Sequence, residues 1–522
     1  MNKFKDVCLK TFNNLSFRIC LLFLSIFFLY YVCNVTNDIN IKYLGWTYFI
    51  LLGSSFIYFA INKKIDNKKI IIYLMLFGIG LRIIYAGYNT ISSRQHDVLG
   101  ATQQGHYGYA LYIFRNNALP DNNANQFYQP PLNAIIQAMW MHFNTLFIKP
   151  PIEINESYLN IFNTGLKFES NNELIVYLDS LYNTTRILSA FYSCLTLIVI
   201  YYILKEFNLK DYLFNLIFAF MCFQPVLTMM AGTVNNDNLS YLFFFLALLF
   251  AIKWFKKPNF INIILIALSI GLGMLTKLSI GFIALLIGPM MIYKFILAIK
   301  NKEYKMMIVQ LLVFAIIVFP LGLSYAIRNL IMFKQSFTYI LDFGEDSWLR
   351  EVIKTKNFYE RFLSFPLSQF VTKRGIFHDY QEYNIWVDLL KTSTYEEFGY
   401  VNHSHIFAGI MLICNLFIYI SGIAATIYIA IMIFKKKYKE NLLLTIICFA
   451  LTIIAIGSYI SLNIKMPYSC TSNFRYISYL AFAGIALIAL ALNHLNIKKV
   501  TQIFSILIGV FAIFTTLFIM VI

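Results

Sequence analysis

The stretch 404-SHIFAGIMLICNLFIYISGIAATIYIAIMIFKKKYKENLLLTIICFALTIIAIGSYISL-462 holds the pattern that decides the fold. Two apolar runs, 404–434 and 441–462, flank a short loop that contains four lysines. A helix needs about 20 apolar residues to cross the hydrocarbon core of a membrane. Short lysine-rich loops between such helices are typical of the cytoplasmic side. The stretch therefore predicts two adjacent membrane spans that are joined at the inner surface.

The same pattern recurs along the whole chain and predicts about 13 spans. They lie near residues 16–35, 43–61, 69–89, 183–204, 212–232, 238–254, 260–276, 278–298, 307–330, 404–434, 441–462, 474–492 and 500–521. If the chain starts inside, its lysine-rich loops all fall on the cytoplasmic side, as the positive-inside bias requires. We therefore predict an all-α polytopic membrane protein.

Composition agrees with this class of protein. The chain is 59% hydrophobic and 13% charged, and its mean hydropathy is +0.66. The formal charge of +17 could suggest nucleic acid, but the lysines sit in short loops between apolar runs. Such lysines anchor a protein to an anionic inner leaflet. The positive charge therefore predicts the lipid bilayer as a partner and argues against a nucleic acid. The basic N-terminus leads into the first predicted span, which we expect to be retained.

Two segments on the outer side are too long to be simple connectors. We expect five regions: N-terminal transmembrane helices (1–89), a first outer catalytic loop (90–182), central transmembrane helices (183–330), a second large outer loop on the acceptor side (331–403), and C-terminal transmembrane helices (404–522). Within the first outer loop, residues 106–116 and 131–143 alternate apolar and polar positions at helical spacing. Both are predicted to be interfacial helices on the outer leaflet.

The first outer loop contains the residues that best suit catalysis. His96 and Asp97 follow the third span, with Arg94 before them and His106 soon after. An isolated His-Asp pair is usually a solvated loop feature, but four such residues beside the membrane favour a functional site. A carboxylate there can act as general base, or can hold a divalent metal together with a histidine. The spacing does not decide between these two roles.

Five cations at the outer ends of the spans are candidates for binding a phosphate. They are Arg82, Arg186, Lys277, Arg328 and Arg475. Any one of them could simply snorkel to the interface. Together they lie at one depth, on the side where the positive-inside bias disfavours cations, and charges at membrane depth usually mark a substrate path. Arginine also matches phosphate by a two-pronged contact. The pattern indicates a lipid-linked phosphate.

Other candidate contacts are less specific. Asp237 lies in the outer turn 232-GTVNNDNLSY-241 and, like His106, is a candidate for a metal or for substrate. Turn chemistry alone could also explain that motif. Candidate sugar or acceptor contacts are Tyr128, Gln129, Tyr383 and Trp386. Aromatic residues at this depth also form ordinary interfacial belts.

Several motifs resemble those of bacterial GT-C glycosyltransferases of the family 39 and family 83 types. These families include protein O-mannosyltransferases and lipid A aminoarabinose transferases. The resemblance covers most of residues 75–490 and rests on RQHDV (94–98), FYQPPLNAII (127–136), VNNDNLSYLFF (234–244), GLGMLTK (271–277) and PYSCTSNFRYISY (467–479). The chain departs from the family pattern at His96 and Asp97, where many relatives have Asp-Glu.

The resemblance implies an inverting transfer of a sugar from a polyprenyl-phosphate donor to a protein, lipid or cell-surface glycan. It implies that Asp97 is the general base on the acceptor hydroxyl, and Lys277, Arg328 and Arg475 match the family's donor phosphate contacts best. It also implies a location in the bacterial inner membrane, with the active site on the extracytoplasmic side.

Two other classes of function use the same features. A polymerase or ligase of surface polysaccharide would act on a diphosphate-linked oligosaccharide, and a flippase would need the cations but no base. The sequence has no Walker A motif, GxSxG elbow or HExxH helix, which argues against an ATP-driven transporter and against common serine or zinc hydrolases. The identities of the sugar and the acceptor stay open.

Overall fold

A computed structural model describes residues 41–89, 94, 105–123, 125–148, 172–337, 339–342, 344–371, 382–400 and 402–522. These residues form helices and turns, without a strand among them. In chain order the main helices are α3 (Ile41–Ile61), α4 (Asn67–Tyr88), α5 (His106–Asn116), α6 (Leu132–Asn144), α8 (Asn172–Lys205), α9 (Asp211–Phe223), α10 (Pro225–Met229), α11 (Asp237–Lys256), α12 (Phe260–Thr276), α13 (Ala284–Lys300), α14 (Tyr304–Phe333), α15 (Glu351–Lys354), α16 (Ser368–Val371), α17 (Ile385–Tyr395), α18 (His405–Phe434), α19 (Leu442–Lys465), α20 (Leu480–Leu495) and α21 (Lys498–Val521).

The predicted fold class, an all-α polytopic membrane protein, is confirmed. Nine of the described helices are long and apolar enough to cross a membrane, and a bent pair would make ten. The predicted span 16–35 lies outside the described residues, whereas every other predicted span coincides with a helix. Two of these helices, α12 and α20, have only 17 and 16 residues. At 1.5 Å per residue they are about 25 Å long, which is shorter than a typical hydrocarbon core.

The bent pair replaces the predicted span 212–232. Its two parts, α9 and α10 with the 3-10 helix η3 (Met230–Gly232), meet at an angle of 52°. Pro225 explains the bend, because it cannot donate the backbone hydrogen bond that a continuous helix requires. The carbonyl of Met221, four residues earlier, accepts instead from Nη2 of Arg82 at 3.2 Å. The bend directs the chain into the turn that precedes α11.

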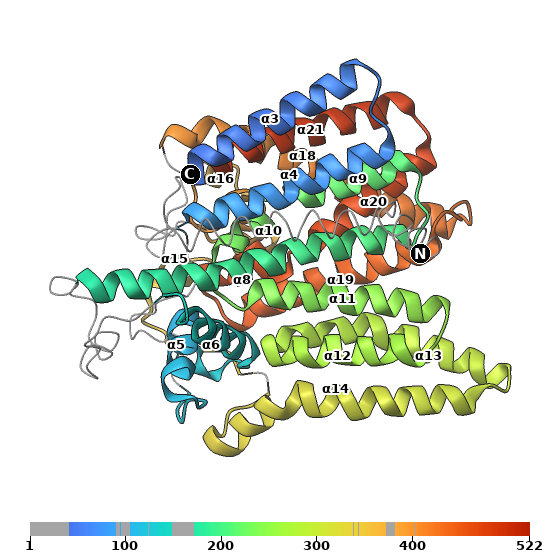
Figure 1. The fold of residues 1–522 in the computed structure, drawn as a ribbon. Coiled ribbons are helices and arrows are strands. Elements are labelled where there is room, and N and C mark those ends of the chain that lie inside the picture. The colour runs from blue at the N-terminus through green and yellow to red at the C-terminus, as the bar shows by residue number, and fades with distance from the viewer. Residues whose placement is uncertain are drawn as a thin grey trace, which may run out of the picture.

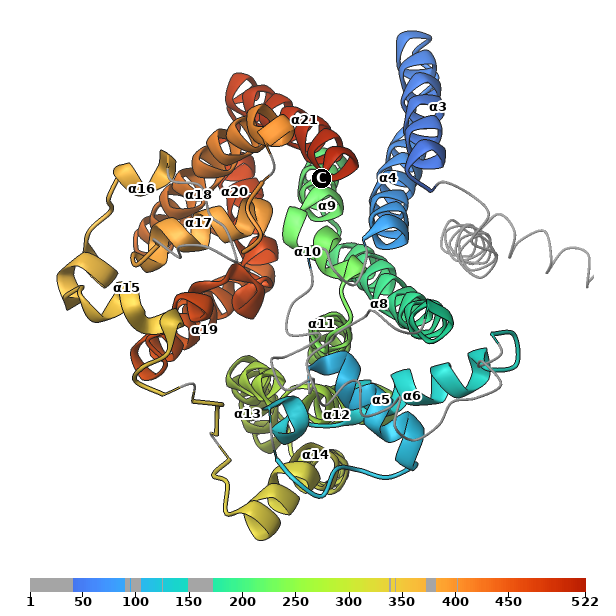
Figure 2. The same ribbon diagram turned by 90° about the vertical axis from the view of Figure 1, so that its left-hand side faces the viewer.

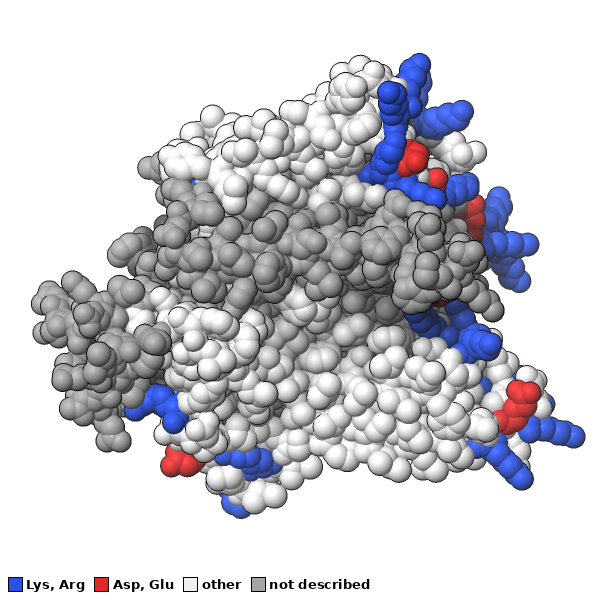
Figure 3. All heavy atoms as spheres, in the orientation of Figure 1, with Lys and Arg blue, Asp and Glu red and all other residues white. Residues whose placement is uncertain are grey.

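The long helices lie side by side, and the molecule has two distinct ends (Figure 1). Most Lys and Arg side chains on the face in Figure 3 gather at its right-hand end. We call this the lysine-rich end; it holds the loops that follow α3, α11, α13 and α18. The opposite end carries α5, α6 and α15, and we call it the site end.

The two helices predicted in residues 90–182, which we call the first outer segment after its predicted position, are present as α5 and α6; their place at the membrane interface stays a prediction. They pack on each other and on the beginning of α8, around a second buried apolar cluster that is separate from the main core. This cluster includes Tyr107, Tyr109, Phe127, Met141, Leu181, Tyr182 and Val234. Because Val234 belongs to the turn before α11, the cluster fixes α5 and α6 against that turn.

The second outer segment covers a different part of the site end. Seen from that end in Figure 2, α15 to α17 lie beside α18 and α19, whereas α5 and α6 lie near the end of α12. Helix α17 is almost wholly buried and carries both apolar and polar side chains. Its Lys391 forms a fully buried ion pair with Glu382, with Nζ and Oε1 2.7 Å apart. Nδ2 of Asn415, on α18, donates to the hydroxyls of Ser393 and Thr394 at 2.8 Å each, which ties α17 to the C-terminal helices.

Candidate active site

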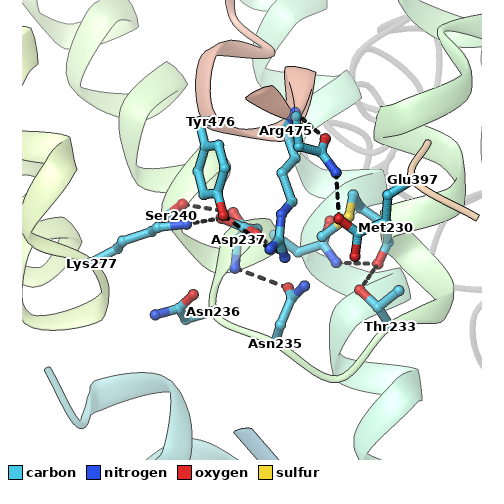
Figure 4. Close-up of polar contacts among 12 residues, drawn as sticks. Met230, Thr233, Asn235, Asn236, Asp237, Ser240, Lys277, Glu397, Arg475 and Tyr476 are labelled. Carbon is cyan, nitrogen blue, oxygen red and sulfur yellow. Dashed lines mark hydrogen bonds and ion pairs between the residues drawn. The ribbon is translucent and has the colours of Figure 1, made fainter. Parts of the chain in front are cut away.

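A buried carboxylate, Asp237, lies at the centre of the candidate site. It is the first residue of α11, and its side chain is 3% exposed. Its Oδ1 contacts Nζ of Lys277, and its Oδ2 lies 3.8 Å from Nη1 of Arg475. Lys277 follows the last turn of α12, and Arg475 belongs to the 3-10 helix η9 (Phe474–Ile477). Figure 4 shows the two cations reaching the carboxylate from different elements. The three side chains together carry one excess positive charge.

The turn before α11 holds Asp237 in place. The backbone N–H of Asp237 donates to Oδ1 of Asn235 at 3.0 Å, and the hydroxyl of Ser240 donates to the Asp237 carbonyl at 2.7 Å. A carboxylate in the first turn also interacts favourably with the helix dipole. The turn starts at Gly232, where a Cβ would lie 2.7 Å from the ring of Tyr85. A glycine is therefore needed for the turn to approach α4 this closely.

Residues of the first outer segment bind to the same turn. The side-chain amide of Asn236 donates to Oε1 of Gln129, and also to the Thr276 carbonyl at 3.1 Å. One residue earlier, the Asn235 carbonyl accepts from Nδ2 of Asn133, on α6, at 3.0 Å. These contacts make the segment around Gln129 and α6 one wall of the site.

The second outer segment reaches Arg475 from the other side. The backbone N–H of Arg475 donates to Oδ1 of Asn473 at 2.9 Å, and its carbonyl accepts from the Tyr241 hydroxyl at 2.6 Å. Nδ2 of Asn473 donates in turn to Oε2 of Glu397, just after α17, at 3.0 Å. The position of Arg475 thus depends on both α11 and the second segment.

An aromatic side chain and a histidine side chain also interact with the charges of the cluster. The ring of Tyr476 lies 5.0 Å from the Arg475 guanidinium and 5.4 Å from Nζ of Lys277, within reach of a cation–π interaction with each. His106, the buried first residue of α5, is close enough to interact electrostatically with Asp237. The site therefore combines one carboxylate, two cations and a titratable imidazole.

Arg94 connects the two outer segments. Its Nη2 donates to the carbonyls of Tyr395 and Gly399, at 2.6 and 2.9 Å. Its own carbonyl accepts from Nδ2 of Asn89 at 3.2 Å, and the same amide donates to the Gly232 carbonyl at 2.9 Å. The start of the first outer loop is thus bound to the end of α17 and to the turn that leads to Asp237.

The structure brings together three of the sequence candidates, Asp237, Lys277 and Arg475, with His106 nearby. The catalytic candidates His96 and Asp97 lie outside the described residues. Among the described residues there is no group of three His, Cys, Asp or Glu side chains that could hold a metal. The role of a metal therefore stays open.

The other three cations have different surroundings. Buried Arg82 donates to Ser193 and to the carbonyls of Gly78, Met221 and Cys222, so its hydrogen bonds all serve the helix packing. Arg328 donates to the Pro120 carbonyl at 2.5 Å and so holds the connection between α5 and α6.

Arg186 is a buried cation with hydrogen-bond donors that are left open. It is 3% exposed, and its Nη2 donates to Oδ1 of Asn183. Its Nε and Nη1 have no hydrogen-bond partner in the part of the chain that is described. A buried guanidinium with open donors is costly unless an anion completes it. This side chain is therefore better suited to receive a ligand than Arg82 is.

The candidate sugar-binding residues lie in two separate places. Gln129 lies at the turn beside Asp237, and the neighbouring Tyr128 ring packs edge-on against Tyr339, with ring centroids 5.3 Å apart. Tyr383 and Trp386 belong to the second segment. The Tyr383 ring lies under Nζ of Lys356 at 4.4 Å, and Nε1 of Trp386 donates to the Phe362 carbonyl at 2.7 Å.

Sequence reasoning missed Glu397, Asn473 and Tyr476, and did not give Arg94 its tethering role. The only sequence signal for Glu397 is a pair of adjacent acids in 395-YEEFGY-400, which has no recognisable spacing to Arg475. Asn473 and Tyr476 are close to Arg475 in the chain, but their contacts are with Glu397, just after α17, and with Lys277, just after α12.

Replacing Asp237 with Asn is expected to destabilise the protein by about 3 kcal/mol, because breaking a buried ion pair leaves uncompensated charge. Lys277 and Arg475, whose side chains are only 21% and 6% exposed, would then face each other without a counter-charge. Thermal unfolding in detergent, followed by tryptophan fluorescence, measures the loss. The matched control is Asp211→Asn, an exposed acid in the first turn of α9. Equal stability of the two variants would contradict the structural role of Asp237.

Residues 146–337 match the family model described as dolichyl-phosphate-mannose-protein mannosyltransferase, a family of the GT-C superfamily. The matched range includes α8 to α14, and hence Asp237 and Lys277; it begins after Asp97 and ends before Arg475. The resemblance to GT-C glycosyltransferases is confirmed over this range. No curated protein matches the chain.

Proposed function

We propose that this chain, whose central region matches a GT-C mannosyltransferase family, is a membrane glycosyltransferase that takes a sugar from a polyprenyl-phosphate donor and transfers it to an acceptor. The observation that carries the proposal is the buried cluster of Asp237 with Lys277 and Arg475. Asp237 directly precedes the predicted span 238–254 and Lys277 directly follows the predicted span 260–276, so we propose that the cluster lies at head-group depth. A phosphate whose lipid tail remains in the bilayer would reach that depth.

The charge of the cluster suits a departing phosphate. Asp237, Lys277 and Arg475 together sum to one positive charge, and this charge suits an anionic phosphate. Fixed cations at the place where negative charge develops stabilise a transition state more strongly than the same groups in water. We assign donor phosphate binding to Lys277 and Arg475, with the open donors of Arg186 as a third contact. Arg82 and Arg328 are assigned to packing and to loop anchoring instead.

The reaction needs a base for the acceptor, and we assign it to Asp97. The acceptor hydroxyl oxygen attacks the anomeric carbon from the face opposite the phosphate and forms the new glycosidic bond. Its proton passes to the Asp97 carboxylate. The bond between the anomeric carbon and the phosphate oxygen breaks, and polyprenyl phosphate leaves with the electron pair. Asp237 is a poor alternative base, because two cations already occupy its carboxylate.

The contacts of Arg94 support this role for Asp97, which follows three positions later. Three residues of extended chain span at most about 10 Å. Arg94 is bound to the loop 395–399, whose Glu397 connects through Asn473 to Arg475. A hydrogen-bonded network therefore links Arg94 to Arg475, and we propose that the residues after Arg94 supply the base beside this network.

We further propose that the site end faces the extracytoplasmic side. The loops at the opposite end carry the lysines that the positive-inside bias assigns to the cytoplasm. The acceptor, whether a protein, a lipid or a glycan, would then approach between the two outer segments. Gln129 lies in one of these segments, and Tyr383 and Trp386 lie in the other.

The test uses the full chain in nanodiscs with a panel of polyprenyl-phosphate sugars and a crude extract of cell-surface acceptors. Release of polyprenyl phosphate is measured with and without a chelator. We expect one donor to turn over, and loss of turnover in the chelator sample would reveal a required metal. Turnover only with diphosphate-linked oligosaccharides, detected by the length of the product, would replace the proposal with a polymerase or ligase. Movement of the lipid-linked sugar across the bilayer without transfer would replace it with a flippase.

A further inference from the structure

An open cavity of about 450 Å³ lies in the second outer segment, among residues that the proposed reaction does not use. It is formed by the 3-10 helix η5 (Trp348–Arg350), helix α15, the short π-helix η6 (Tyr359–Leu363) and the loop after α19. Its lining residues are Glu345, Arg350, Ile353, Lys354, Arg361 and Pro467. In Figure 2, α15 lies at the edge of the molecule beside α19 and apart from α11.

The lining has more positive than negative charge. Arg350 and Lys354 lie 3.8 and 3.7 Å from the carboxylates of Glu345 and Asp346, but these acids are 87% and 108% exposed. Ion pairs with such exposed acids contribute little, because water screens them. Arg361 also lines the cavity, and its Nε has no hydrogen-bond partner among the described residues. Burial and the neighbouring Arg350 guanidinium both lower the pKa of Arg361. An added anion would relieve this repulsion.

The cavity is at the level where a membrane span ends. Nη2 of Arg361 donates to the carbonyl of Asn463 at 3.0 Å, in the last turn of α19. That helix is one of the candidate spans, with 24 residues. Its length of about 36 Å slightly exceeds a typical hydrocarbon core, so its last turn lies at the head groups.

The element that supplies Arg361 also exposes large apolar side chains. These are Phe358, Tyr359, Leu363, Phe365 and Leu367, which are 46–74% exposed. Apolar side chains that are exposed together beside a cation are typical of segments lying in the membrane interface. The cationic cavity matches the phosphate head group of an anionic lipid, and the apolar surface in the same short segment matches its acyl chains.

We propose that this cavity binds the phosphate of an anionic phospholipid from the surrounding leaflet. Arg350, Lys354 and Arg361 would contact the phosphate oxygens, for which guanidinium groups are geometrically suited. The acyl chains would lie against the exposed apolar residues of 358–367. The site is distinct from the donor site and does not depend on the proposed glycosyl transfer.

Such a lipid would fix the second outer segment to the membrane surface. The contact that transmits this is the hydrogen bond from Trp386, on α17, to the Phe362 carbonyl, in η6. Helix α17 leads in turn to Glu397, which supports the position of Arg475 through Asn473.

The test measures binding of a fluorescent phosphatidylglycerol to the purified full chain in non-ionic detergent, with phosphatidylcholine as the neutral probe. Each cation near a membrane surface contributes about fivefold in affinity. The variant Arg350→Gln/Lys354→Gln is therefore expected to bind phosphatidylglycerol roughly 25-fold more weakly. Glu345→Gln, which removes the acid that lines the cavity among the described residues, is expected to bind it more tightly. Because these two variants act in opposite directions, misfolding cannot account for both.

The matched control is Lys334→Gln, which removes an exposed cation at the same end of the protein but outside the cavity. It is expected to bind phosphatidylglycerol like the wild type. Equal affinity for the two lipids, or an equal effect of Lys334→Gln and the double variant, would overturn the proposal. Displacement of the lipid by millimolar inorganic phosphate would assign the cavity to a soluble phosphate ligand instead.

Discussion

Replacing Asp97 with Asn is expected to lower the transfer rate by about 10²–10⁴-fold, the usual contribution of a general base. An amide keeps the shape of the side chain but cannot accept the proton of the acceptor hydroxyl. The donor phosphate is bound elsewhere, by Lys277 and Arg475 in our assignment, so the affinity for the donor should change little. Release of polyprenyl phosphate measures the rate, and equilibrium binding of the labelled donor measures the affinity.

The matched control for this variant is Asp121→Asn, an exposed acid of the same outer segment. Its side chain accepts a hydrogen bond from the adjacent Asn122, away from the cluster around Asp237, so we expect this variant to be fully active. Wild-type turnover in Asp97→Asn would remove the residue from the mechanism. In that case His106, which interacts with Asp237, would become the first alternative base to examine.

Replacing Lys277 with Gln is expected to reduce turnover by about 10²–10³-fold, comparable with the loss of one fixed group that stabilises transition-state charge. The departing phosphate would lose a preorganised cation, and Asp237 would then neutralise Arg475 alone. The KM for the donor should also rise, because the same cation holds the phosphate before the reaction. Steady-state kinetics over a range of donor concentrations separate the two effects.

A second variant separates the effect of the positive charge of Lys277 from the effect of its packing. Lys277→Arg keeps the positive charge, so it should recover part of the activity lost in Lys277→Gln. Lys334→Gln serves as the surface control, since it removes a lysine at the end of α14 away from the cluster. If Lys277→Gln retained the wild-type kcat and KM, the donor phosphate would have to bind at other cations, with Arg186 as the next candidate.

The two outer segments meet at the candidate site. Arg94 binds the end of α17, and Glu397 supports Asn473 beside Arg475. Arg94, three positions before the proposed base, and Arg475, one of the proposed phosphate cations, are therefore held by the same small network. Substitutions in this network should change the proposed transfer even where they touch neither donor nor acceptor.

The sequence alone determined the membrane architecture. The length of the apolar runs predicted the long apolar helices between α3 and α21, because burying a backbone in lipid requires a continuous helix; it did not predict α15, α16 and α17. Helical spacing also predicted α5 and α6 to within a residue or two. These features are local, so a single sequence is enough to predict them.

Only the tertiary structure decided which cations belong together. In the sequence, Arg82 resembles Arg475 as an arginine at a span end, yet Arg82 donates to carbonyls that the Pro225 bend leaves open. Asp237, Lys277 and Arg475 meet because α11, α12 and η9 end at the same place. Hydropathy fixes where each helix crosses the membrane but not its neighbours, since lipid and protein surfaces are equally apolar. The pairing of charges follows from helix packing and is therefore decided by the fold.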